Sequence, residues 1–293
     1  MSRGNLSHVP LKFLKAHGAG NDFIVLDEIN GHLAEDLGPL ARRLTCRRTG
    51  IGADGLLVIR RNEGIPAMEC WNADGSRAEA CGNGLRVVSR ILFEKEGAHQ
   101  ILTDSGMVPV EIYLSDSGEF LSRAVLGPVV CSAPLDFEIQ GQHFSGIPVN
   151  VGNPHLVVSQ EALTGFDPVR ELGPTLEASA PERVNVGFYV IEEKNKLQLR
   201  VWERGCGETL ACGTGAVAAV VALQQKNLLE DEVTVSMPGG ELFIRKVNSS
   251  GATHMAITGP AEITFTGEVD LSAKGLLPTV KKLDSLQEFR QSN

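Results

Sequence analysis

The chain has 293 residues, of which 42% are hydrophobic and 22% are charged, and its formal net charge is −9. This composition is typical of a globular protein with room for two domains, and it excludes a disordered or fibrous chain. The acidic balance argues against a nucleic-acid partner, because phosphate backbones are bound by basic surfaces. No apolar run is long enough to span a bilayer, and the pattern of the first residues predicts no secretory signal. We therefore expect no membrane association, a cytoplasmic location and six cysteines present as thiols.

Strand and helix patterns alternate along the chain. Short β-branched or apolar runs, bounded by Gly, Pro, Asn and Asp, predict strands at 23–27, 55–61, 68–73, 155–159, 188–193, 197–203, 232–237 and 241–247. Helical patterns cover about 39–47, 83–97 and 213–229, with a glycine stop near Gly97, and a weaker pattern covers 166–177. No role is assigned to residues 1–10 or to the polar tail after Ser272.

The sequence repeats itself. "GNDFIVLD" starts at Gly20 and "GNPHLVVS" at Gly152, an offset of 152 − 20 = 132, and Cys81 and Cys212 differ by 212 − 81 = 131. Self-similarity at one offset indicates a duplicated domain. We expect two copies, 11–125 and 126–259, each an α+β domain with a mostly antiparallel, twisted sheet wrapped around one helix.

The repeated cysteines lie in matching settings, "EACGNG" and "LACGTG", which leaves a disulfide, half of a metal site or a catalytic pair open. Each is followed by Gly-x-Gly and a helical run, so each thiol is expected at a helix N-terminus, where free N–H groups lower a thiol pKa and attract a ligand carboxylate. Cys46, Cys70 and Cys131 have no repeat partner and are interpreted as small buried hydrophobes. Cys206 and Cys212 match no common zinc or redox spacing, so no metal is expected.

Five motifs, in register over about residues 11–271, resemble those of the diaminopimelate epimerase family. They are "HGAGNDFIVLD", "NADGSRAEACGNGLR", "VGNPH", "VNVGF" and "WERGCGETLACGTGA". The resemblance implies two pseudo-symmetric domains, each a twisted β-barrel around a central helix, with 260–271 returning to the first. It also implies conversion of LL-2,6-diaminopimelate to the meso isomer, in lysine and peptidoglycan-precursor biosynthesis, by a homodimer without pyridoxal phosphate.

Roles for individual residues follow from the same resemblance. Epimerisation removes an α-proton and returns one to the opposite face, which one base cannot do. Cys81 and Cys212 match the family's thiolate and thiol, with the first acting on the LL centre. Residues that match substrate contacts divide into three groups. The backbone N–H groups that hold the reacting carboxylate are those of Gly82, Asn83, Gly213 and Thr214, and Asn21 lies at the same end of the substrate. The positions that match the family's ligands of the distal carboxylate are Asn72, Asn153, Asn185 and Arg204.

Two auxiliary positions and one departure complete the comparison with the family. Glu203 matches an ammonium-binding residue near the second cysteine, and His155 matches a proton partner near the first. Gly55 departs from the pattern, because some family members carry Gln there, contacting the substrate's amino group. Backbone or water is expected to replace that contact.

Three other readings stay open at the level of the sequence. A proline racemase-like or hydroxyproline epimerase enzyme also pairs two cysteines, but it has no use for Arg204 and Asn72. A thiol–disulfide redox protein would use Cys81 with Cys212, or Cys206 with Cys212, and would oxidise them during turnover. A catalytically inactive binding module would not need both cysteines.

Overall fold

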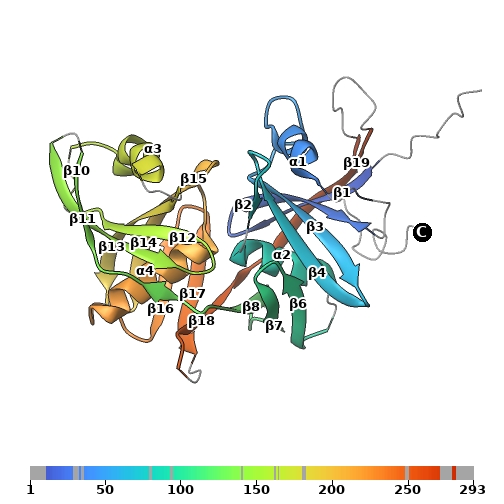
Figure 1. The fold of residues 1–293 in the computed structure, drawn as a ribbon. Coiled ribbons are helices and arrows are strands. Elements are labelled where there is room, and N and C mark those ends of the chain that lie inside the picture. The colour runs from blue at the N-terminus through green and yellow to red at the C-terminus, as the bar shows by residue number, and fades with distance from the viewer. Residues whose placement is uncertain are drawn as a thin grey trace, which may run out of the picture.

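The structure is a computed structural model that describes residues 11–28, 33, 36–78, 81–92, 95–139, 141–161, 163, 165–179, 183–247, 251–270 and 279–281. Two lobes lie side by side, each with a helix packed inside its strands and another on its outside (Figure 1). The first lobe contains β1 Leu11–Gly18, β2 Asn21–Asp27, α1 Gly38–Thr45, β3 Gly55–Asn62, β4 Ile65–Asn72, β5 Arg77–Ala78, α2 Gly82–Leu92, β6 Gly97–Thr103, β7 Gly106–Leu114, β8 Phe120–Leu126, β19 Glu262–Val269 and β20 Thr279–Lys281. The second contains β9 Val130–Cys131, β10 Leu135–Ile139, β11 Gln142–Asn150, β12 Pro154–Ser159, α3 Pro168–Ser179, β13 Asn185–Glu193, β14 Lys196–Glu203, β15 Gly207–Thr209, α4 Gly213–Gln225, β16 Glu232–Met237, β17 Gly240–Val247 and β18 His254–Pro260.

The strand pairing repeats from one lobe to the other. In the first, β2 pairs in parallel with β3, β3 pairs antiparallel with β4, and β4 pairs with β5 and, in parallel, with β6. In the second, the strands from β12 to β16 pair in the same way. The hairpins β6–β7–β8 and β16–β17–β18 then follow as antiparallel meanders. The expected α+β fold of two repeated, mostly antiparallel domains is confirmed.

The central helices are α2 and α4. Every residue of α4 from Gly213 to Leu223 is buried, which explains why its sequence is apolar on all sides instead of amphipathic. Helix α2 is buried along nearly its whole length. Both helices belong to one hydrophobic cluster that runs through the two lobes, so the N-termini of α2 and α4 are held by a common core. Two smaller clusters, one in each lobe, lie beneath α1 and α3.

One strand pair connects the lobes: β8 of the first pairs antiparallel with β18 of the second, with Leu126 opposite Met255. After β18 the chain returns to the first lobe, where β19 pairs with β1, with Leu11 opposite Val269. The chain therefore crosses between the lobes twice, and their relative position is set by backbone hydrogen bonds as well as by side-chain packing. We propose 11–125 with 260–271, and 126–259, as the limits of the two domains.

Three helices differ from the sequence-based expectation. Helix α4 ends at Gln225, about four residues before the predicted end. Helix α2 ends at Leu92, and Gly97 begins β6 instead of terminating the helix. Helix α3 is a full helix of 12 residues although its pattern is weak and Pro174 lies inside it. A Cβ on Gly173 would lie only 2.7 Å from the ring of Trp202, so the helix is packed directly onto β14. Tertiary packing therefore compensates for a poor helical sequence. Among the described residues, no helix has the length and apolar character needed to cross a membrane.

Candidate active site

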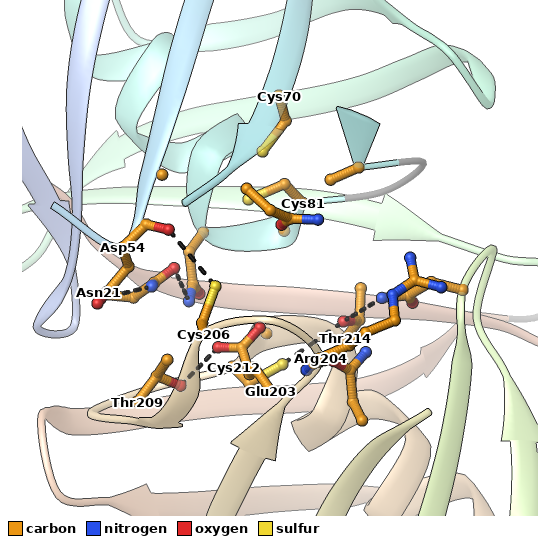
Figure 2. Close-up of a pocket in the computed structure, with 18 of the residues that line it drawn as sticks. Asn21, Asp54, Cys70, Cys81, Glu203, Arg204, Cys206, Thr209, Cys212 and Thr214 are labelled. Carbon is orange, nitrogen blue, oxygen red and sulfur yellow. Dashed lines mark hydrogen bonds between the residues drawn. The ribbon is translucent and has the colours of Figure 1, made fainter. Parts of the chain in front are cut away.

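One pocket lies where the N-termini of α2 and α4 meet, with strands of both lobes around it (Figure 2). All the residues expected from the sequence to form the site line it, except His155. The described residues that line it are Asn21, Phe23, Asp54, Gly55, Cys70, Trp71, Asn72, Ala78, Cys81, Gly82, Asn83, Asn153, Asn185, Glu203, Arg204, Cys206, Thr209, Cys212, Gly213 and Thr214.

The two repeated cysteines cap the two helices in the same way. The Cys81 Sγ accepts a hydrogen bond of 3.2 Å from the N–H of Gly84, and the Cys212 Sγ accepts one of 3.4 Å from the N–H of Gly215. Each thiol thus takes the third amide of its helix. The first two amides of each helix have no intrahelical acceptor and are left for a ligand anion.

The two helix starts touch each other, and glycine makes this possible. A Cβ on Gly213 would lie 3.0 Å from the Oδ1 and 3.4 Å from the backbone N of Asn83. A Cβ on Gly82 would lie 3.8 Å from the Cα of Gly213. Since any larger residue at 213 would push the helices apart, the Gly after Cys212 brings the amides of both repeats to one place.

The expected lowering of the thiol pKa is wrong for Cys212. Burial raises its pKa well above the ordinary value, the negative charge of Glu203 raises it further, and the hydrogen bonds from Thr214 and Gly215 only partly oppose this. Cys212 is 3% exposed, so the stabilisation that its thiolate loses with hydration is larger than the stabilisation that the helix N-terminus provides. Without ligand, the Cys212 sulfur is a neutral thiol that can donate a proton.

Glu203 lies beside this thiol. Burial raises the pKa of Glu203 to about 7, against the opposing effect of hydrogen bonds with Thr209 and Cys212. The hydroxyl of Thr209 donates to the Glu203 carboxylate at 2.5 Å. A carboxyl group with a pKa near 7 exchanges protons readily at neutral pH, and this one contacts the sulfur of Cys212.

Two further cysteines line the pocket. Cys70, expected to be only a core residue, lies on β4 with its thiol toward Cys81 (Figure 2). The neighbouring Cys81 thiol and burial together raise the pKa of Cys70 well above its ordinary value. Cys206 donates from its Sγ to the carbonyl oxygen of Asp54 at 3.6 Å, and burial raises its pKa to about 12. All six cysteines are free, and both of these are held in the protonated form.

A chain of amides connects the lobes across the floor of the pocket. The Nδ2 of Asn83 donates to the Oδ1 of Asn21 and to the carbonyl oxygen of Ala211, both at 3.0 Å. The Nδ2 of Asn21 donates in turn to the Oδ2 of Asp54 at 3.0 Å. Asn21 and Asn83 are 6% and 2% exposed, so these bonds are shielded from water.

Asp54 belongs to a charged cluster behind the pocket that motif comparison missed. Its carboxylate pairs with Arg47, which also pairs with Asp22, while Lys15 contacts Asp22 at 2.5 Å. Burial and the nearby charge of Asp22 raise the pKa of Asp54, whereas hydrogen bonds from Arg47 and Lys15 outweigh burial and lower the pKa of Asp22 to about 2. The "GADG" segment and the acidic residue after Asn21 were the available signals in the sequence.

The departure at Gly55 has a structural counterpart. Gly55 lies opposite Phe23 in the β2–β3 pair, and a Cβ at this position would lie 3.3 Å from the Phe23 ring and 3.0 Å from the carbonyl oxygen of Trp71. The wall of the pocket here is an aromatic ring and backbone.

Arg204 and the three asparagines that the family resemblance groups with it also line the pocket. The backbone N–H of Arg204 donates to the Oδ1 of Asn185 at 2.9 Å, and its guanidinium donates to the carbonyl of Arg183 at 3.4 Å. No carboxylate of the described residues forms a salt bridge with Arg204, so its charge is available to a ligand. Asn153 donates to the Thr214 hydroxyl at 3.4 Å. The remaining member is Asn72, whose Nδ2 donates to the Oγ of Ser76 at 2.9 Å.

His155 does not line the pocket but contacts Asn153, which does. Its Nε2 is 3.0 Å from the Oδ1 of Asn153, and burial, together with the charge of Arg204, lowers its pKa to about 3. The imidazole is therefore neutral at physiological pH. Because Asn153 Oδ1 only accepts, the His155 Nε2 is the protonated nitrogen. Among the described residues, no group of His, Cys, Asp and Glu is arranged to hold a metal ion.

Solved structures with similar folds share this two-lobed architecture. A hydroxyproline epimerase from Agrobacterium vitis superposes with a TM-score of 0.71 at 13% identity, covering 92% of this chain and 94% of that one. A Bacillus anthracis protein of the phenazine biosynthesis PhzF family superposes with a TM-score of 0.70 at 15% identity, covering 89% and 99%. At such low identity these likenesses define the fold, which is the two-repeat fold common to these proteins.

Comparison with sequence relatives identifies the family as well as the fold. The diaminopimelate epimerase family model matches residues 13–130 and 147–264. The diaminopimelate epimerase of Carboxydothermus hydrogenoformans is 38% identical over 275 residues, which are 88% of this chain and 99% of the relative. That of Cupriavidus taiwanensis is 40% identical over 294 residues, covering 90% and 98%. The chain belongs to the diaminopimelate epimerase family, isomerases that act on amino acids without pyridoxal phosphate.

Proposed function

We propose that the protein epimerises LL-2,6-diaminopimelate to meso-diaminopimelate by a two-cysteine mechanism that needs no cofactor. The observation that supports this most strongly is the pair of helix N-termini, one from each repeat, each capped by a cysteine and meeting in one pocket. Two thiols on opposite sides of one bound carbon are what inversion of a stereocentre requires. Family membership supports the choice of substrate.

The reaction consists of two proton transfers. In the direction from the LL isomer, the Cys81 thiolate takes the α-proton, and the Cys212 thiol gives its proton to the opposite face of the same carbon. Negative charge that develops on the α-carbon spreads into the α-carboxylate. The free amides of Gly82, Asn83, Gly213 and Thr214 would bind that carboxylate and stabilise the charge, as fixed dipoles do in a site shielded from water. The neutral state of Cys212 supports its role as the acid in this direction.

The reverse reaction needs a Cys212 thiolate. We assign to Glu203 the task of receiving the thiol proton, because its carboxylate contacts the sulfur and has a pKa of about 7. A substrate ammonium group beside Glu203 would favour the ionised carboxylate, so binding and deprotonation would support each other. The role of His155 as a proton partner of Cys81 stays a prediction. Its contact with Asn153 supports a positioning role at the distal end.

Recognition of the distal end would depend on Arg204. Its guanidinium forms no salt bridge with a carboxylate of the described residues, and Asn72, Asn153 and Asn185 line the same pocket. A bidentate Arg–carboxylate pair gives both energy and orientation. A substrate with a carboxylate at each end fits a pocket with two anion-binding ends. We also propose, on the family resemblance, a role in lysine and peptidoglycan-precursor biosynthesis, a cytoplasmic location and a homodimeric state.

The substrate is tested by comparing amino acids at equal concentration. Purified protein, with no added cofactor, should epimerise LL-diaminopimelate and show little activity on lysine, which lacks the distal carboxylate. Proline, which lacks the distal arm, should also react poorly. If proline is racemised as fast as diaminopimelate is epimerised, the distal site has no function and the proline racemase reading is correct.

A further inference from the structure

A buried cation lies one turn inside helix α2. Arg86 is 0% exposed, which makes it the largest fully buried side chain of the described residues. Its guanidinium donates to the Oδ1 of Asn83 at 2.7 Å, to the carbonyl of Gly82 at 3.3 Å and to the carbonyl of Pro260 at 3.4 Å. The first two acceptors belong to the helix start that forms the pocket floor. The third belongs to the strand that connects the lobes.

No carboxylate of the described residues neutralises this cation. In the part of the chain that the structure describes, Arg86 forms no salt bridge, and burial lowers its pKa to about 10, opposed by the negative charge that Cys81 can carry. Buried charges without an ionic partner are rare in proteins because their desolvation is costly. Cys81 directly precedes Gly82, whose carbonyl oxygen the Arg86 guanidinium contacts at 3.3 Å, so a thiolate at Cys81 would lie beside this cation.

Arg86 also determines the direction of a hydrogen-bond chain. A guanidinium only donates, so the Asn83 atom that faces it must be the carbonyl Oδ1. The Nδ2 of Asn83 then donates to Asn21 Oδ1 and to Ala211 O, and the Nδ2 of Asn21 donates to Asp54. Were Asn83 reversed, its Oδ1 would face the carbonyl of Ala211 and the contact between the two repeats would become repulsive.

We propose that Arg86 is a positioning residue of the reaction, acting through Asn83 and beside Cys81. It orients the Asn83 amide so that the start of α2 is hydrogen-bonded to the residue before Cys212, and it places a positive charge next to the Cys81 sulfur. The inference rests on the proposed function only for its effect on turnover.

Two substitutions at this position separate the charge from the hydrogen-bonding fork. Arg86→Met removes both, and Arg86→Lys keeps a cation that cannot bind three acceptors in a plane. Arg86→Met should lower kcat/KM at least about 10-fold, or about 1.4 kcal/mol. Arg86→Lys should fold like the wild type and still lose activity, since the orientation of Asn83 is no longer imposed. Arg90→Met, a guanidinium on the same helix that stacks on Phe120, is the matched control and should keep normal kcat/KM.

A double-mutant cycle between Arg86→Lys, which keeps the charge beside Cys81, and Asn83→Ala distinguishes positioning through Asn83 from simple destabilisation. If Arg86 acts through Asn83, the kcat/KM of the double variant should lie within about 3-fold of that of the less active single variant. The proposal would be overturned if the double variant lost kcat/KM by the product of the two single-variant factors. It would also be overturned if Arg86→Lys kept the wild-type kcat/KM.

The placement of the charge is tested without turnover. Iodoacetamide labelling, followed by peptide mass spectrometry, compares Cys81 with Cys212 in each variant. The rate of Cys81 labelling should be lower than that of the wild type in Arg86→Met. It should be close to the wild-type rate in Arg86→Lys and in Arg90→Met. Equal labelling of Cys81 in all of them would contradict the charge role. A wild type that does not epimerise diaminopimelate would contradict the proposed function, while this labelling comparison would still decide the role of Arg86.

Discussion

The side chain of Asn83 in the first repeat donates a hydrogen bond of 3.0 Å to the carbonyl oxygen of Ala211 in the second. Ala211 directly precedes Cys212, and Asn83 is the second residue after Cys81, so this bond connects the two cysteine-bearing segments. The relative position of the two sulfurs therefore depends on contacts between the repeats, and a ligand held by the amides of both helices lies at this junction.

Removal of either thiol should stop the reaction. Cys81→Ala and Cys212→Ala should each lower kcat by at least about 10²- to 10⁴-fold, the usual contribution of a general acid or base, because no other group serves the same face of the carbon. Circular dichroism and thermal unfolding should show a folded protein in both cases. Cys131→Ala, a thiol outside the pocket, is the control and should turn over normally. Near-normal turnover by either site variant would contradict the two-base mechanism.

Glu203 should make the stability of the ligand-free protein fall as pH rises. Its pKa is raised from 4.5 to about 7 in the folded state. Between these values the native state binds more protons than the unfolded state, so the free energy of unfolding decreases with increasing pH. Glu203→Gln cannot titrate, and its melting temperature should decrease less than that of the wild type between pH 5 and pH 8. The exposed Glu193→Gln variant should behave like the wild type. Identical slopes for all three proteins would show that Glu203 is not held in the protonated form.

Arg204→Met should impair recognition and leave the thiols unchanged. The loss of one partner of a buried charge pair costs about 2–5 kcal/mol, so kcat/KM for diaminopimelate should decrease at least ~30-fold. Thiol titration should match the wild type, since the hydrogen bonds of Arg204 among the described residues are to Asn185 and Arg183 and not to a sulfur. Arg170→Met, an exposed arginine paired with Glu208 outside the pocket, should have normal kinetics. Unchanged kinetics in Arg204→Met would place the distal carboxylate elsewhere.

Oxidation of the ligand-free protein should link Cys81 to Cys212. Both sulfurs line one pocket, and a small closing motion would bring them to bonding distance. Treatment with diamide should abolish activity, dithiothreitol should restore it, and peptide mapping should find the 81–212 disulfide. Activity that survives the oxidant with both thiols free and accessible would contradict this geometry. A link between Cys70 and Cys81 instead would show that the two repeats do not close over the empty pocket.

The predictability of the site differed from residue to residue. Cys81 and Cys212 could be recognised because repetition preserves both the cysteine and the glycines that allow the helix starts to meet. The high pKa of Cys212 could not be predicted, because its main cause is the complete burial of the thiol, which depends on the tertiary packing of both lobes. Arg86 ends one of the five matched motifs, but its burial could not be predicted, because an arginine on a helix is usually exposed. Helix α3 was underestimated because its packing on Trp202, which local propensity does not register, stabilises it.

The two-base mechanism is tested most directly by following deuterium during epimerisation in D₂O. Purified protein without cofactor is mixed with LL-diaminopimelate, and at low conversion the remaining substrate and the meso product are separated and analysed by mass spectrometry. One cysteine removes the substrate's proton and the other delivers a solvent-derived deuteron, so the meso product should carry one deuterium at the inverted carbon while the remaining LL substrate carries almost none. Deuterium in the recovered substrate at a level similar to that in the product would indicate one base serving both faces and would contradict the account, as would the absence of any meso product.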